Sequence, residues 1–449
     1  MASDSETPFR ILVMGDFGST SGSNRPTVID RDNFEHVLER MAVALELPGA
    51  GTLRIKEMDD FHPDRLFSSL QIFQGLRDVR AQIADPRSFE RTASELMTTA
   101  RSSEKPAPPQ DFLSSGSLLE QVVERSQEGP AAATARGLDP FQQYLRAIVA
   151  PYLVPRPDPK QGEMLAQVDN ATAAQMRALL HYKPFQSLEA AWTSLYFLVR
   201  LIETDTDLKI YVWHMPKKTL ASDLLPATDL KSTTLYRVLV KETVSTPGAH
   251  PWAVVAGNYS FGPGAQDVEM LGRFALLAGA ANTPLIARAD ASLLGDDLTA
   301  WSELRAIAEA KYIGLALPGF LLRLPYGKES SPTDTFHFEE MADEPKHSDY
   351  LWGNPSIACA ALMAQAFTRG GWEMQPGDLL DMSGLPAHVY KKDGEAVMKP
   401  CAEVLMTQEE AEALMALGLM PLLSMKNSDR VHLAGFRAIN GEPLAGRWD

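Results

Sequence analysis

Residues 312–327, YIGLALPGFLLRLPYG, indicate how this chain folds. The stretch is apolar enough to be buried, yet Pro318, Pro325, several glycines and the single charge of Arg323 interrupt it. A short apolar run with such boundaries is typical of a buried strand that leads into a loop. We therefore predict a strand over its first residues, YIGLALP.

Strand and helix signals alternate on both sides of this stretch. Strands are predicted for residues 207–215, 251–259, 283–289 and 388–392. Helical spacing of apolar residues predicts helices over residues 163–181, 186–204, 267–281, 297–310, 354–370 and 407–418. Alternation of this kind indicates an α/β layered fold, with mixed sheets flanked by helices.

The N-terminal block is a second α/β region. FRILVMG, residues 9–15, predicts a strand, and residues 52–58 predict another. Residues 30–45 predict a helix with Asp30 or Asp32 as its N-cap. Residues 62–83 predict the clearest helix of the block, with Pro63 in its first turn.

Proline-rich stretches divide the chain into segments. Residues 101–116 contain three prolines and no periodicity, which predicts a linker. We predict one domain over residues 1–100 and a larger one over residues 163–449. The linker and a helical segment over residues 117–162 separate them.

The composition limits the classes of partner and the compartment. Apolar residues make up 45% of the chain and charged residues 22%, as in soluble globular proteins. The formal net charge of -16 disfavours nucleic acids and anionic membranes, so neither nucleic-acid binding nor direct membrane insertion is expected. The N-terminus lacks a secretory signal, and Cys359 and Cys401 form no CxxC pair. We predict a cytoplasmic protein.

Short motifs that suggest chemistry are incomplete. Residues 15–22, GDFGSTSG, lack the lysine of a phosphate loop, and residues 261–267, FGPGAQD, lack one glycine of a dinucleotide-binding turn. Residues 337–347 contain two histidines and four carboxylates, but in no known metal-ligand spacing. We predict no catalytic, cofactor or metal site. An enzyme that uses the cluster at residues 337–347 is the alternative.

Longer motifs, taken in order, resemble the contractile sheath of the bacterial type VI secretion system. FRILVMGDFG, IDRDNFEHVLERM and LRIKEMDDFHPDRL, within residues 9–97, resemble the small (TssB/VipA-like) sheath subunit. SLLEQVVERS, SFGPGAQDVEML, YIGLALPGFLLRLPYG and HSDYLWGNPSIACAAL, within residues 112–447, resemble the large (TssC/VipB-like) subunit. The chain therefore resembles a fusion of both subunits.

The resemblance gives residues 312–327 a structural role. In the sheath family this stretch is a core strand followed by a conformationally fixed loop, and the prolines end the strand. An unpaired buried charge is costly, so Arg323 is expected to pair with a carboxylate or to cap carbonyl groups. YLWGN, residues 350–354, is expected to pack ahead of the next helix.

The ends of the sequence differ from the family pattern. Sheath subunits of the family are joined by strands exchanged in an inner layer. Only eight residues precede Phe9, and the sequence ends at GEPLAGRWD. The resemblance therefore predicts that the N-terminal exchange strand and the C-terminal inner-layer domain are missing, and that polymerisation by strand exchange is lost.

Residues 117–127 predict a short amphipathic helix. In the family, the corresponding helix of the large subunit is recognised by a recycling AAA+ unfoldase. Its apolar stripe is therefore a candidate interaction site, made of Leu118, Leu119, Val122 and Val123. The alternative is a helix that packs on its own domain.

The expected function is structural. The resemblance predicts a fused, truncated sheath-like protein of a type VI secretion apparatus that acts as adaptor, cap or assembly regulator. Its expected partners are sheath, baseplate or cap proteins, with an AAA+ unfoldase as a further candidate. The alternatives are a polymerising sheath subunit and a soluble sheath mimic that binds the unfoldase or sheath subunits.

Overall fold

The chain forms two compact units. The computed structural model describes residues 7–22, 25–48, 50–102, 145–146, 148–149, 161–294, 299–341 and 345–449. Unit 1 combines Met1–Val43, Ser187–Leu324 and Tyr350–Asp449, and unit 2 combines Ala44–Gln186 with Pro325–Asp349. Each unit therefore draws on both of the predicted domains.

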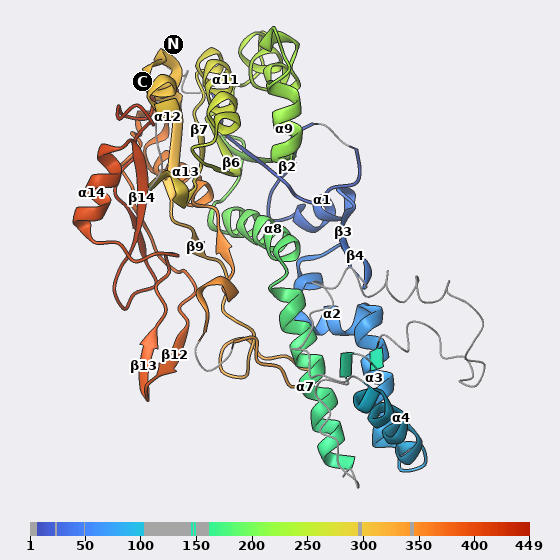
Figure 1. Ribbon diagram of the computed structural model, residues 1–449. Coiled ribbons are helices and arrows are strands. Elements are labelled where there is room, and N and C mark those ends of the chain that lie inside the picture. The colour runs from blue at the N-terminus through green and yellow to red at the C-terminus, as the bar shows by residue number, and fades with distance from the viewer. Residues whose placement is uncertain are drawn as a thin grey trace. The chain divides into compact units, whose positions relative to one another are not determined.

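A nine-stranded mixed sheet is the centre of unit 1 (Figure 1). Its strand order is β11-β15-β14-β8-β7-β6-β1-β5-β2. The strands from β14 to β5 run parallel: β1 (Phe9–Gly15), β5 (Leu208–His214), β6 (Val254–Phe261), β7 (Leu285–Ala289), β8 (Ile313–Leu317) and β14 (Leu419–Ser424). The outer strands pair antiparallel: β2 (Thr27–Ile29), β11 (Asp381–Met382) and β15 (Val431–Leu433).

Helices cover both faces of this sheet. One face packs against α9 (Lys217–Leu224), α10 (Thr234–Tyr236), a π-helix (Arg237–Val244), α11 (Ala265–Ala281) and α12 (Thr299–Ala306). The opposite face is covered by α13 (Pro355–Gly370), which contacts β1, β6, β7 and β8. Both faces of the parallel strands are therefore removed from water.

This burial explains the apolar runs in the sequence. Parallel strands covered on both faces need apolar side chains on both. All five residues of β8 are buried, which confirms the strand predicted at the start of residues 312–327. The strands predicted at residues 207–215, 251–259 and 283–289 are confirmed as β5, β6 and β7. The predicted α/β class with mixed sheets and flanking helices is confirmed.

Smaller elements complete unit 1. The helices α8 (Lys183–Leu201) and α14 (Gln408–Ala416) form close to where they are predicted. Two short antiparallel pairs lie outside the large sheet: β9 (Phe320–Leu321) with β10 (Trp352–Gly353), and β12 (Val389–Lys392) with β13 (Glu395–Met398). The second pair confirms the strand predicted at residues 388–392.

The helix predicted over residues 30–45 is wrong in its length and its cap. α1 spans only Phe34–Arg40, because Ala42 has the left-handed φ of 50° that ends a helix. The chain continues as β3 (Val43–Leu47). Asn33 takes the N-cap position, and the Asp30 carboxylate accepts hydrogen bonds from the backbone N–H groups of Asp32 and Asn33.

Unit 2 is mainly helical. α3 (Gln71–Ala84) packs against α4 (Phe89–Ser102) and α7 (Gln161–Leu180), and β3 pairs with β4 (Gly51–Ile55). The helix predicted over residues 62–83 is interrupted: α2 (Pro63–Ser69) ends before the extended Leu70, and α3 begins after it. Pro63 occupies the first turn of α2, as predicted.

The helices that the structure describes do not have the composition of membrane spans. Across the ranges that the structure describes, none combines the length and the apolar composition needed to cross a bilayer.

Candidate interaction site

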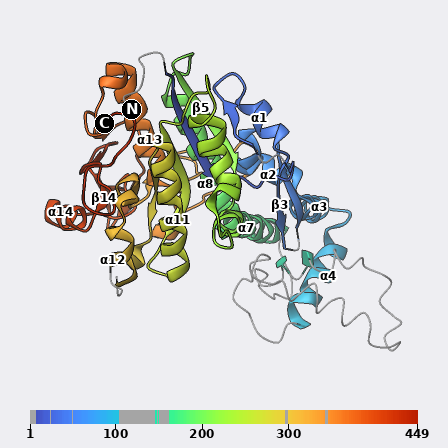
Figure 2. The same cartoon turned by 90° about the horizontal axis from the view of Figure 1, so that it is seen from above.

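The strand β1 ties the N-terminal residues into the central sheet of unit 1. It pairs along its whole length with β5, from Phe9 opposite Leu208 to Gly15 opposite His214. On its other edge it pairs with β6, and Figure 2 shows β1, in dark blue, beside β5. The apolar side chains of β1 are at most 1% exposed: Phe9, Ile11, Leu12, Val13 and Met14. β1 is therefore an interior strand of the sheet.

Arg10 is the one charged residue of β1, and aromatic rings hold it at the sheet. Its guanidinium carbon lies 3.9 Å from the ring centre of Trp252 and 4.6 Å from that of Tyr211. The Arg10 Nη1 group also donates a hydrogen bond to the carbonyl of His250. Burial lowers the pKa of Arg10. The cation–π contacts stabilise the charge close to β5 and β6 and help to hold β1 in place.

Arg323 forms a buried ion pair, as predicted. Its Nε lies 2.6 Å from Oε1 of Glu189, whose side chain is only 1% exposed. Arg323 also donates from Nη1 to the carbonyl of Leu324 at 3.1 Å. The pair connects α8 to the loop after β9, so both charges are compensated inside unit 1.

The turn after β8 is held by a second ion pair. Oε2 of Glu403 accepts hydrogen bonds from Nη2 of Arg288 at 2.6 Å and from the backbone N–H of Gly319 at 3.0 Å. A Cβ at Gly319 would lie 2.8 Å from the carbonyl oxygen of Gly353, so no larger residue fits there without a shift. The loop is therefore conformationally fixed, as the sheath resemblance implies.

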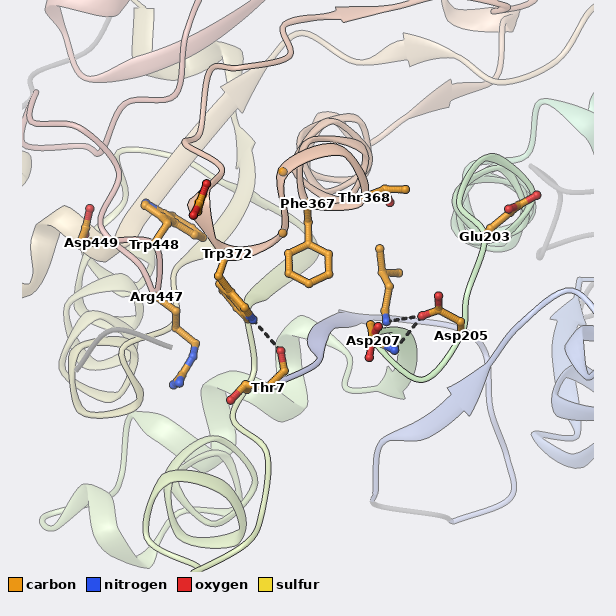
Figure 3. Close-up of a pocket in the computed structure, with 14 residues that line it drawn as sticks. Thr7, Glu203, Asp205, Asp207, Phe367, Thr368, Trp372, Arg447, Trp448 and Asp449 are labelled. Carbon is orange, nitrogen blue, oxygen red and sulfur yellow. Dashed lines mark hydrogen bonds between the residues drawn. The ribbon is translucent and has the colours of Figure 1, made fainter. Parts of the chain in front are cut away.

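A cavity of about 730 Å³ lies beside the start of β1 (Figure 3). Trp372 donates a hydrogen bond from its indole Nε1 to the carbonyl of Thr7 at 2.6 Å, and the backbone N–H of Phe9 donates to the carbonyl of Asp207 at 2.6 Å. The Phe9 ring centre is 4.8 Å from that of Phe367 and 5.6 Å from that of Trp372. The walls of the cavity thus come from the end of α13, the α8–β5 loop, the residues before β1 and residues 447–449.

The cluster predicted at residues 337–347 supports a loop within unit 2. The buried Glu340 accepts a hydrogen bond from the backbone N–H of Tyr326 at 2.8 Å, and its own N–H donates to the Tyr326 carbonyl at 2.8 Å. His181 lies 3.4 Å from the same carboxylate. Asp343 and Glu344 lie outside the described residues. Among the residues that are described, no three His, Cys, Asp or Glu side chains gather as a metal site would require.

The two glycine-rich motifs are bonded to the protein itself. In residues 15–22, the hydroxyls of Ser19 and Thr20 donate to the carbonyls of Met41 and Ala42. Residues 261–267 lead from β6 into α11, and Asp267 accepts from the N–H of Gly262 at 2.8 Å. Both motifs therefore act as hydrogen-bonded turns.

The predicted helix over residues 117–127 lies outside the residues that the structure describes. Its four candidate residues, Leu118, Leu119, Val122 and Val123, therefore remain a sequence-based prediction.

The cavity beside β1 was not predicted from the sequence. Its lining comes from four separate stretches of chain, at Thr7 and at residues 203–208, 367–373 and 447–449. No local motif links these stretches. Trp372 and Trp448 are a weak signal in the sequence, because tryptophans are typical anchors of cores and interfaces in general.

One family model matches the N-terminal part of this chain, which contains β1 and β2, and another matches the part that contains the other strands of the sheet. The model VipB, described as EvpB/VC_A0108, tail sheath N-terminal domain, matches residues 162–300 and 295–440, more than half of the chain. The chain belongs to the VipB tail sheath family. The model for VipA of the type VI secretion system (VipA, VC_A0107 or Hcp2) matches residues 1–98 of this VipB-family chain. The resemblance to a fusion of the small and large sheath subunits is confirmed.

A curated relative agrees with this assignment. The VipB-family chain is 32% identical over 303 residues to the type VI secretion system sheath protein TssC1 of Pseudomonas aeruginosa PAO1. The match covers 62% of this chain and 60% of TssC1. The chain therefore spans about 60% of the length of that relative.

Proposed function

We propose that this VipB-family protein is a structural, sheath-like component of a type VI secretion apparatus in which two sheath-subunit segments act as one unit. The position of β1 carries the proposal. β1 lies within the VipA match at residues 1–98, while its neighbours β5 and β6 lie within the VipB match at residues 162–300. One chain therefore supplies both segments to a single sheet, in a fixed one-to-one ratio.

Within the apparatus, we favour an adaptor, a cap or an assembly regulator over a polymerising subunit. The nine-stranded sheet ends in β2, of three residues, and β11, of two residues. Short edge strands offer few backbone groups for strand addition by a neighbouring subunit. This favours contacts through side-chain surfaces over continuous extension of the sheet.

Exposed apolar side chains support binding to other proteins. Of the eight large hydrophobic residues exposed among the described ones, five lie between residues 389 and 425: Val389, Val404, Leu405, Leu417 and Met425. Leu405 is 64% exposed and Val404 is 51% exposed, side by side in the sequence. Neighbouring exposed apolar side chains, such as those of Val404 and Leu405, are candidates for an interaction surface, because contiguous apolar patches mark such surfaces. We propose sheath, baseplate or cap proteins as the partners.

Co-sedimentation with assembled type VI sheaths tests this function. The wild-type protein is expected to pellet with the sheaths and to remain in the supernatant alone. The double variant Val404→Ser, Leu405→Ser is expected to pellet less, whereas the control Leu276→Ser, on the exposed face of α11, should pellet like wild type. A wild-type protein that stays in the supernatant with sheaths and with purified baseplates would contradict the proposal.

The molar mass in solution distinguishes the two roles. Light scattering coupled to size exclusion should give the 49.3 kDa monomer or a small closed oligomer for an adaptor or cap. A very large, polydisperse species would favour the polymerising subunit.

A further inference from the structure

The cavity beside β1 combines aromatic rings with carboxylates. Phe367 and Trp372 form one wall, with ring centres 5.3 Å apart at an angle of 72°. Figure 3 shows Asp205 and Asp207 on one side of these rings and Arg447 on the other. The volume of about 730 Å³ is large enough for more than one side chain of a bound segment.

The charge of the lining is strongly negative. Five carboxylates line the cavity, and Arg447 is the one cation among its lining residues. These acidic residues are Glu203, Asp205, Asp207, Glu373 and Asp449. Within the part of the chain that the structure describes, none of them forms an ion pair.

Several of the carboxylates that line the cavity already accept hydrogen bonds from the protein itself. The Asp205 carboxylate accepts from the N–H groups of Asp207 and Leu208 at 2.7 and 2.8 Å, which holds the loop before β5. The guanidinium carbon of Arg447 lies 5.9 Å from the ring centre of Trp372. The Asp449 carboxylate accepts from the N–H of Gly446 at 3.0 Å, and that of Asp207 accepts only the long bond of 3.4 Å from the Thr206 hydroxyl. Glu203, Asp207 and Glu373 are exposed and carry the negative charge that a ligand can reach.

This chemistry selects a cation with an apolar stem. The described carboxylates do not gather in a group of three that could hold a metal ion, whereas a guanidinium group bonds to carboxylates and stacks on aromatic rings. An anionic ligand would be repelled by the net charge of the lining. A second copy of this chain carries a formal net charge of -16, so long-range electrostatics favour a basic partner over self-association.

We propose that this cavity binds an arginine-bearing extended segment of a partner protein, with the guanidinium group between the carboxylates and the rings of Phe367 and Trp372. Glu203, Asp207 and Glu373 supply the charge, and the rings contact the apolar stem and the face of the guanidinium group. This site goes beyond the proposed apparatus role and does not rest on it.

A labelled peptide of alternating arginine and glycine, titrated with the full-length protein, tests the site by fluorescence anisotropy. The control peptide has citrulline at each arginine, which keeps the shape and removes the charge. At about 50 mM salt, the arginine peptide is expected to bind about tenfold more tightly than the citrulline peptide or better. Equal binding of the two peptides, or no binding of the arginine peptide, would overturn the proposal.

Two triple variants with the same change of net charge distinguish binding in the cavity from general electrostatic attraction to the acidic protein. The triple variant Glu203→Gln, Asp207→Asn, Glu373→Gln should weaken binding of the arginine peptide about tenfold, which corresponds to about twofold for each of the three carboxylates. The control has the same change of charge at exposed positions elsewhere: Glu39→Gln, Asp78→Asn, Glu409→Gln. It should change binding less than about twofold. If both triple variants weaken binding of the arginine peptide equally, the attraction is non-specific and the proposed site is wrong, whatever the result of the co-sedimentation experiment.

Discussion

Ile11→Ala tests whether β1 is an interior strand of the sheet. Ile11 is fully buried, pairs with Ile210 on one side and Val254 on the other, and shares a sheet face with Phe9. Phe9 contacts Phe367, so this face is the one that packs on α13. The substitution removes buried carbon atoms from the centre of unit 1.

The cost follows from the burial. Replacing isoleucine by alanine removes carbon groups worth about 0.8 kcal/mol each when buried, about 2.4 kcal/mol in total. The cavity left between the sheet and α13 raises the expected loss in the free energy of unfolding to about 3–4 kcal/mol. Val28→Ala is the matched control, because Val28 is 41% exposed on the edge strand β2. It should cost about 0.5 kcal/mol or less.

Urea unfolding followed by tryptophan fluorescence measures this difference within unit 1. All seven tryptophans of the chain lie in unit 1, and Trp213 in β5 pairs with Met14 of β1. Ile11→Ala should lower the midpoint of the transition strongly, and Val28→Ala only slightly. A loss below about 1 kcal/mol for Ile11→Ala would refute the interior position of β1.

Three further predictions follow from buried groups. Glu189→Gln removes the buried negative charge that Arg323 contacts, so it should lower the free energy of unfolding in urea by about 3–5 kcal/mol. The double variant Glu189→Leu, Arg323→Met should recover most of that loss. A loss below about 1 kcal/mol for Glu189→Gln would contradict the buried ion pair. Burial raises the pKa of the Cys359 thiol to about 12 and that of the Cys401 thiol to about 11. A disulfide reagent at pH near 8 should therefore react with these thiols only as the protein unfolds. Fast reaction of the native protein would contradict the burial of both thiols. Burial lowers the pKa of His214 below its value of about 6.5 in the unfolded chain, so the free energy of unfolding should fall as the pH drops through and below that value. This fall should be smaller in His214→Ala. The same pH dependence in the wild type and the variant would contradict the lowered pKa of His214.

Long periodic or uniformly apolar segments were predictable from the sequence. The helices at residues 163–181 and 186–204 and the strand at the start of residues 312–327 match α7, α8 and β8. Their patterns are decided by burial, which acts over many residues at once. The pairing of Arg323 was predictable for a related reason, since burial of a lone charge is too costly.

Elements whose ends depend on one residue were not predictable. Ala42, with its left-handed backbone, ends α1, and Leu70 separates α2 from α3, although neither residue is a strong breaker by type. β14 contains Pro421, which normally argues against an interior strand, and it was not predicted. In these cases tertiary packing overrides local preference.

Strand order was also beyond the sequence. FRILVMG predicts a strand, and its apolar run from Ile11 to Met14 is typical of a strand buried on both faces, yet nothing local shows that it lies between β5 and β6. The cavity beside β1 depends on this order, because it brings Thr7 next to Trp372. Two expectations stay predictions. They are the division into domains at residues 1–100 and 163–449 and the interaction helix at residues 117–127.

Cleavage between the two family segments tests the central claim most directly. A specific protease site is placed within residues 101–116, between the VipA match and the VipB match, and the purified protein is cut to completion. If β1 is an interior strand of the shared sheet, the two fragments should elute together, and light scattering should give the mass of the uncut chain, 49.3 kDa for a monomer. Fragments that separate without denaturant would contradict the claim that the two sheath-subunit segments fold as one unit.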